Sequence, residues 1–116
     1  MDLDIDHEAF FNRSELAERM GGDEEVIEEV VECFLQEVPL QLEELRAALE
    51  ECDFHQMQEL AHGMKGSCLN VSANTMCETA LEIETLIKEN ELDRVTEATD
   101  KLEAMFDTTR KVITGE

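Results

Sequence analysis

Residues 23–51, DEEVIEEVVECFLQEVPLQLEELRAALEE, carry apolar side chains three and four positions apart along their whole length. The apolar positions are Val26, Ile27, Val30, Val31, Phe34, Leu35, Val38, Leu42, Leu45 and Leu49. This spacing predicts one long α-helix with a single buried face, and Asp23 is its expected N-cap. Pro39 interrupts the run, and a proline inside a helix costs about 3 kcal/mol. We therefore expect a helix kinked at Pro39, or, as the alternative, a break at Glu37–Val38.

Shorter helical patterns lie on both sides of this long helix. Asn12-Arg13-Ser14-Glu15 has the spacing of a capping box, and Gly21-Gly22 is a typical helix end. Asp53 begins a further helix with the same capping pattern, Asp53-Phe54-His55-Gln56. The predicted helices span about 12–20, 23–51, 53–69, 75–89 and 92–112, and the last uses Leu92, Val95, Leu102, Met105, Phe106 and Val112 on its apolar side.

Four substantial helices joined by short turns predict an all-α fold, an antiparallel four-helix bundle with a short extra N-terminal helix. A chain of 116 residues is expected to form a single domain over 1–116. Residues 1–11 are interpreted as an acidic lead-in, and the folded core is expected over about 12–112.

The charge balance excludes several classes of partner. The chain has 30 Asp and Glu against 9 Lys and Arg, a net charge of −21. Nucleic acids and anionic membrane surfaces require basic patches, so neither is an expected partner. No apolar run approaches the roughly 20 residues that span a bilayer, and Met1–Asp6 does not have the pattern of a signal peptide. We expect a soluble, cytoplasmic monomer.

The four cysteines, Cys33, Cys52, Cys68 and Cys77, show no Cys-x-x-Cys spacing and mostly occupy apolar periodic positions. Buried free thiols in a reducing compartment are therefore expected in preference to a disulfide framework.

The distribution of charge changes sharply in the predicted helix over 53–69. No Asp or Glu occurs from Leu60 to Cys77, and Lys65 is the only Lys or Arg between Arg46 and Lys88. Plotted on a helix, Phe54, Met57, Leu60, Ala61, Met64, Cys68 and Val71 share the apolar face. The opposite face carries His55, Gln58, Glu59, His62, Gly66 and Leu69, with Lys65 at its edge.

His62 and Lys65 are therefore expected to project from neighbouring turns of one helix, with carboxylates kept away. A neutral imidazole nitrogen can attack phosphorus, and a nearby cation can stabilise the charge on the phosphoryl oxygens. His62 is the candidate phosphoacceptor, and Lys65 the candidate for stabilising the phosphoryl group. No catalytic base is expected to be poised on His62, and no magnesium site is expected.

Two glycines inside this helix also require an explanation. Gly63 and Gly66 each cost about 1 kcal/mol relative to alanine in a helix. Such a cost is explained if another surface approaches closely, so both are candidate partner-contact residues. Ser67, Leu69, Gln58 and His55 complete the expected partner-binding set, with Leu69 as its large aliphatic contact.

With these residues in view, the sequence resembles the histidine-containing phosphotransfer (HPt) domains of multistep two-component phosphorelays. Their signature places Lys, Gly and a small residue three, four and five positions after the histidine, matching Lys65, Gly66 and Ser67. Gly22-Asp23, the segment Leu45-Arg46-Ala47-Ala48-Leu49 and Asp53 are also similar, and the resemblance covers about 12–112. One departure is Ser72, where members usually carry glycine, and it concerns the turn after the histidine helix.

The resemblance implies a four-helix bundle whose exposed His62 exchanges a phosphoryl group with an aspartate of a response-regulator receiver domain. A sensor histidine kinase is the other implied partner. The chain would then be a phosphoryl carrier and not an enzyme. It would have no cofactor of its own, and Mg²⁺ would be bound by the receiver domain.

Three alternatives are open at this point. His62 could be an ordinary solvent-exposed histidine. Glu59 and His62 form a Glu-x-x-His pair of the kind found in di-iron bundles, but no second pair exists and this one faces outward, so no metal site is expected. The serious competitor is a helical adaptor or inhibitor that binds receiver or kinase domains without transferring a phosphoryl group.

Overall fold

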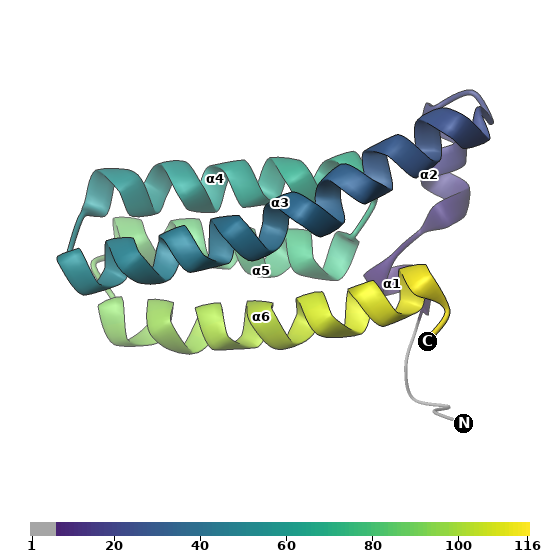
Figure 1. Ribbon diagram of the computed structural model, residues 1–116. Helices are drawn as coiled ribbons and strands as arrows, with labels where there is room; N and C mark the ends of the chain where they lie inside the picture. Colours follow the sequence, from purple (N-terminus) through teal and green to yellow (C-terminus); the bar gives the residue numbers. More distant parts are fainter. Residues whose placement is uncertain (1–6) are drawn as a thin grey trace.

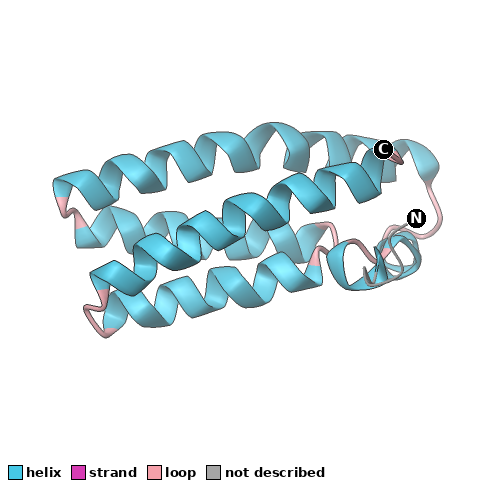
Figure 2. Cartoon of the chain, turned by 90° about the horizontal axis from the view of Figure 1, so that it is seen from below, coloured by secondary structure: helices cyan, strands magenta, loops and turns pink. Residues whose placement is uncertain are grey.

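The computed structural model describes residues 7–116, which form six helices and no strand (Figure 1). The long helices are α3 (Glu24–Glu51), α4 (Phe54–Asn70), α5 (Asn74–Lys88) and α6 (Leu92–Thr114). They run antiparallel in chain order, and short loops connect them (Figure 2). The all-α antiparallel four-helix bundle is therefore confirmed.

Neighbouring helices enclose one continuous core. α4 packs against α3 and α5, and α6 completes the bundle by packing against α5 and α3. The largest fully buried side chains are Phe34, Leu16, Ile27, Leu45, Met57, Met64, Met76, Ile83, Leu102, Val38, Val71 and Val95. The rings of Phe34 and Phe106 lie 5.8 Å apart between centroids and join α3 to α6.

The helix starts follow the capping predictions. The Asp23 carboxylate accepts from the backbone N–H groups of Glu25 and Val26, and Asp53 accepts from Gln56. α3 is continuous from Glu24 to Glu51, so the alternative break at Glu37–Val38 does not occur.

Two short helices precede the bundle, where the sequence predicts one. Besides the expected α2 (Arg13–Arg19), residues of the acidic lead-in form α1 (His7–Phe10). α1 packs against α5 and α6, and the Thr75 hydroxyl donates to the Ala9 carbonyl at 2.7 Å. So short a helix is unstable alone, and these tertiary contacts stabilise it. The rest of the lead-in, residues 1–6, lies outside the described residues.

The loops between the long helices use left-handed backbone at residues other than glycine. Cys52, Ser72 and Asn90 have φ angles of 55°, 58° and 60°. Ser72 thus adopts, at the departure from the HPt pattern, a conformation that glycine adopts at no steric cost. Its hydroxyl accepts from Arg19 of α2 and its carbonyl accepts from the N–H of Asn12, so the N-terminal segment holds this turn.

Two expectations about burial were wrong. Cys68 is buried, but Cys33 and Cys52 are exposed and Cys77 is intermediate, although all four are free as expected. Cys52 follows the end of α3 in the αL turn, and Cys33 lies at the edge of α3 beside α4. Phe54, expected on the buried face, is 39% exposed because α4 begins there, at the end of the bundle. None of the described helices combines the length and apolarity that a membrane span requires.

Candidate functional site

α4 divides into the two faces that its sequence predicts. Met57, Leu60, Ala61, Met64 and Cys68 are buried. His55, Gln58, Glu59, His62, Gly63, Gly66 and Leu69 are exposed, and Lys65 is intermediate at the edge between the two faces. The burial of one face therefore determines which side chains of α4 can meet another molecule.

The His62 side chain is 75% exposed, and one of its ring nitrogens has a specific partner. Nδ1 of His62 lies 2.9 Å from Oε1 of Glu84, on α5. The Glu84 side chain is only 12% exposed. Because an ionised carboxylate can only accept, the proton of the neutral ring lies on Nδ1 in this contact. The lone pair is then on Nε2, which makes Nε2 the nucleophilic atom of the ring.

The same carboxylate also binds the lysine of the motif. Nζ of Lys65 lies 3.4 Å from Oε2 of Glu84, and its side chain is 24% exposed. Glu84 therefore bridges an imidazole and an ammonium that lie one turn apart on α4. This arrangement places a positive charge near the imidazole and also restrains the lysine side chain.

Glu84 corrects one expectation from the sequence. Carboxylates are absent from the chain between Leu60 and Cys77, but they are not kept away from His62, because α5 packs beside α4 and supplies one. Glu84 contacts Nδ1 and not Nε2, so the expectation that no catalytic base is poised on His62 stays a prediction. A signal for Glu84 was present: it shares a helical face with Ala80 and Ile87, both buried, and a glutamate at such a position needs a partner.

The glycines of α4 are not required by packing within the chain. A Cβ built on Gly66 would meet no atom within 4 Å, and one on Gly63 would meet only Nε2 of Gln41, at 3.6 Å. The latter is an ordinary van der Waals distance. Both positions could therefore hold alanine as far as the described residues are concerned, which leaves the approach of another molecule as a reason for glycine.

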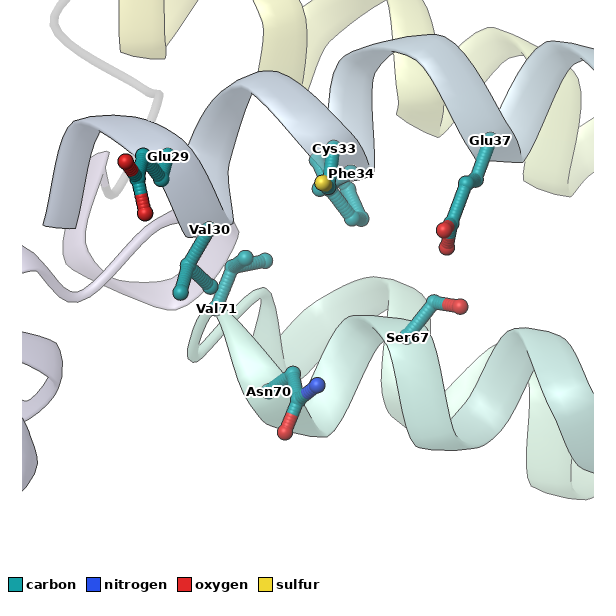
Figure 3. Close-up of a pocket in the computed structure, with 8 residues that line it drawn as sticks. All are labelled: Glu29, Val30, Cys33, Phe34, Glu37, Ser67, Asn70 and Val71. Atoms are coloured by element: carbon teal, nitrogen blue, oxygen red, sulfur yellow. The ribbon is translucent and has the colours of Figure 1, made fainter. Parts of the chain in front are cut away.

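Ser67 joins the exposed face to the neighbouring α3. Its hydroxyl donates to the Gly63 carbonyl at 3.1 Å and accepts from Nε2 of Gln41 at 3.4 Å. These contacts are those of a packing residue. Ser67 also borders a hollow of about 330 Å³ between α3 and α4, lined by Glu29, Val30, Cys33, Phe34, Glu37, Ser67, Asn70 and Val71 (Figure 3). In Figure 3 the Glu37 and Ser67 side chains extend into the space between the two helices.

The other predicted contact residues lie along the same outward face. Leu69 is 49% exposed near the end of α4, where Arg19 donates to its carbonyl at 2.8 Å. Gln58 is exposed. The His55 side chain is 82% exposed, and its Nε2 lies 3.2 Å from Oε1 of Glu59, one turn further along α4. The structure thus brings Lys65 to His62 through Glu84 and leaves His55 two turns away.

No metal site accompanies these residues. Within residues 7–116, no group of three or more His, Cys, Asp or Glu side chains is arranged to hold a metal ion. Glu59 and His62 therefore gain no further ligands from the other described helices.

Comparison with known proteins agrees with this geometry. A family model described as Hpt domain matches residues 29–112, which include α4, α5 and most of α3 and α6. No curated protein and no solved structure matches the chain. Hpt domains are helical phosphotransfer modules of two-component systems, generally phosphoryl carriers without enzymatic activity, and they interact with receiver domains and kinases. Because the match covers most of the sequence and the fold is the expected helical bundle, the chain belongs to the Hpt domain family.

Proposed function

We propose that His62 is the phosphoacceptor and that it exchanges a phosphoryl group with an aspartate of a response-regulator receiver domain. The observation that carries the proposal is the pairing of His62 Nδ1 with Glu84 on a ring that is 75% exposed. One nitrogen is occupied inside the bundle, and Nε2 is left for a partner.

In the forward step, the Nε2 lone pair attacks the phosphorus of the receiver's aspartyl phosphate in line with the leaving carboxylate oxygen. The N–P bond forms, the P–O bond breaks, and the aspartate leaves as a carboxylate. The Nδ1 proton stays on the ring, which becomes positively charged. Glu84, 2.9 Å from Nδ1, balances this charge. The reverse step returns the phosphoryl group to a receiver aspartate by the same bond changes.

Lys65 acts on the phosphoryl group in this proposal. Its ammonium lies 3.4 Å from the carboxylate that holds the imidazole, one turn away from His62. A short rotation of the flexible side chain brings it toward oxygens attached to Nε2. A cation there stabilises the negative charge that spreads over the equatorial oxygens during transfer.

The outward face of α4 receives the partner. Gly63 and Gly66 allow a receiver surface to approach the helix closely, since neither has a packing requirement within the described residues. Leu69 supplies an exposed aliphatic contact, and Gln58, Ser67 and His55 border the approach. We assign Mg²⁺ binding and most of the catalysis to the receiver, so that this chain acts as the carrier, as a monomer in the cytoplasm.

The test is incubation with receiver domains that have been charged with labelled acetyl phosphate. Transfer predicts a label on the chain that is labile in acid and stable in base, and that is lost in His62→Gln. His7→Gln, which changes an exposed histidine on α1 outside the partner-facing side of α4, is the control and should keep the label. Binding of the receiver without any label would contradict the proposal and support an adaptor.

A further inference from the structure

A second feature of the surface lies away from His62, on the side where α3 meets α6. A hollow of about 530 Å³ opens there, lined by Phe11, Arg13, Ile27, Glu28, Val31, Glu32, Leu35, Val112 and Ile113. The N-terminal part of α3 extends beyond the end of α4 in this region (Figure 1). None of the residues around His62 takes part in it. We call this hollow the α3/α6 groove.

The lining of the α3/α6 groove is mostly apolar. Val31, Leu35 and Val112 belong to the periodic apolar positions that predict a buried helix face, and Ile113 lies next to them. All four side chains are only partly buried in the structure. They pack against the core on one side and remain accessible beside the hollow on the other, so apolar surface is available there to another molecule.

The charges around the groove that have no ion-pair partner among the described residues are of one sign. Glu28 and Glu32 are exposed, and neither forms an ion pair with any residue the structure describes. Arg13, the basic residue of the lining, is paired with Glu24. The two basic residues that precede Val112 on α6 are also paired. Arg110 contacts Asp107 and Glu116, and Lys111 contacts Asp107. The charge left for a partner is therefore negative.

We propose that the α3/α6 groove docks an amphipathic helix of a partner protein, with aliphatic side chains entering the groove and Lys or Arg side chains beside Glu28 and Glu32. Helices commonly bind in this way, placing an apolar stripe into a groove between two helices. A second copy fits poorly, because each chain carries a net charge of −21 and the same two carboxylates would face each other. The chain's own first residues contain Asp2, Asp4 and Asp6, which the groove's carboxylates also repel.

Docking there is compatible with phosphotransfer. The groove lies between α3 and α6, whereas His62 projects from the outward face of α4 beside α5. A helix bound in the groove therefore leaves Nε2 of His62 accessible. The proposal adds a tethering surface to the transfer site, so that a kinase or regulator can retain the carrier between transfer events.

The probe is a fluorescent 18-residue peptide of leucine and lysine, with leucine at helical i, i+3, i+4 and i+7 spacing. We expect it to bind the intact chain, with anisotropy rising on titration and the affinity falling as salt increases. Ile113→Glu should weaken binding by at least tenfold. Leu81→Glu makes the same change in charge at a leucine that is 50% exposed on α5, outside the groove, and should have little effect.

A second variant separates binding from folding. Glu28→Gln with Glu32→Gln changes only exposed carboxylates, so the fold is retained, and it should weaken binding and reduce its salt dependence. Equal binding by a peptide of the same composition in scrambled order would overturn the proposal. Binding of a peptide that has glutamate in place of lysine would also overturn it. So would a loss of peptide affinity in Leu81→Glu equal to the loss in Ile113→Glu.

Two further outcomes would assign the groove to another occupant and overturn the proposal. One is a dimer in sedimentation experiments that Ile113→Glu dissociates. The other is tighter peptide binding after removal of residues 1–6, which would mean that the chain's own N-terminus fills the groove. Phosphotransfer by Ile113→Glu is measured in parallel and should be unchanged, so failure of docking is distinguished from failure at His62.

Discussion

Glu84 on α5 contacts both His62 and Lys65 on α4, with Oε1 2.9 Å from the imidazole Nδ1 and Oε2 3.4 Å from the ammonium. A single carboxylate, 12% exposed, thus organises an imidazole that is 75% exposed. The helix that carries the candidate nucleophile does not orient it alone. The packing of α4 against α5 selects the nitrogen that faces solvent.

Replacement of Glu84 tests this relationship. In Glu84→Ala the ring loses the acceptor for its Nδ1 proton, so we expect the neutral ring to shift toward the Nε2-protonated tautomer. ¹⁵N NMR of the imidazole measures this shift, and transfer from a charged receiver should slow in parallel. Glu84→Gln retains an acceptor oxygen and should keep more of the Nδ1-protonated form than Glu84→Ala. An unchanged tautomer in Glu84→Ala would show that the carboxylate does not orient the ring.

Lys65→Ala should slow phosphotransfer about tenfold or more, because loss of a charge-stabilising group at a transition state typically has at least this effect. The fold should be retained, since Lys65 lies at the edge of α4 and its ammonium pairs with Glu84. Single-turnover kinetics with a charged receiver and far-UV circular dichroism check the two expectations. An unfolded variant would show that Lys65 has a structural role, and an unchanged rate would exclude it from the transfer chemistry.

Gly66 should show opposite effects on stability and on transfer. Gly66→Ala is expected to raise the free energy of unfolding by about 1 kcal/mol, because alanine is favoured in helices and its Cβ meets nothing. Gly66→Leu should block transfer from the receiver, since its side chain occupies the approach to His62. Urea denaturation and transfer rates measure the two effects.

The matched control is Thr96→Leu, which adds a leucine at an exposed position of α6. It should leave transfer unchanged. Normal transfer in Gly66→Leu would mean that no partner surface comes close to α4 at this turn.

The stability of the fold should decrease in alkaline solution through one buried thiol. Burial, with a smaller contribution from Cys77, raises the pKa of Cys68 to about 12. Above about pH 8.5 the unfolded chain releases this proton while the folded chain keeps it. The contribution of this pKa difference to the free energy of unfolding is fully present below that pH. It is lost as the pH rises toward 12, by up to about 1.4 kcal/mol per pH unit.

Comparison of Cys68→Ala with the unmodified chain isolates this effect, because all other groups that titrate at alkaline pH are the same in the two proteins. Urea denaturation between pH 8 and pH 11 should give a shallower decline for Cys68→Ala. Cys33→Ala, which removes an exposed thiol, should keep the original slope. Identical slopes for all three proteins would contradict the assignment to Cys68.

The features that could be predicted from the sequence depend on neighbours in the chain. Asp23 and Asp53 cap the helices that follow them, and the outward face of α4 follows from apolar spacing. α1 could not be predicted in this way, because its stability comes from contacts with α5 and α6. The role of Glu84 depends on the register of α4 against α5, and the spacing of apolar residues within each helix does not predict that register.

The same distinction applies to the surface. The spacing that predicts burial identifies Val31, Leu35 and Val112 as apolar-face residues. It does not distinguish a side chain buried in the core from one that lines a groove. Cys33 shows the reverse error, since a periodic position at the edge of α3 remained exposed. Whether a helix face is covered depends on the length of the neighbouring helices, and α3 is longer than α4.

The most direct test of the account is to locate the phosphoryl group on the ring of His62. The chain is labelled with ¹⁵N in its histidines, charged from a phosphorylated receiver, and examined by ³¹P and long-range ¹H–¹⁵N NMR. If Glu84 holds the proton on Nδ1, the phosphorus is bonded to Nε2 and Nδ1 still carries its proton. Phosphorus on Nδ1, or on a residue other than His62, would contradict it.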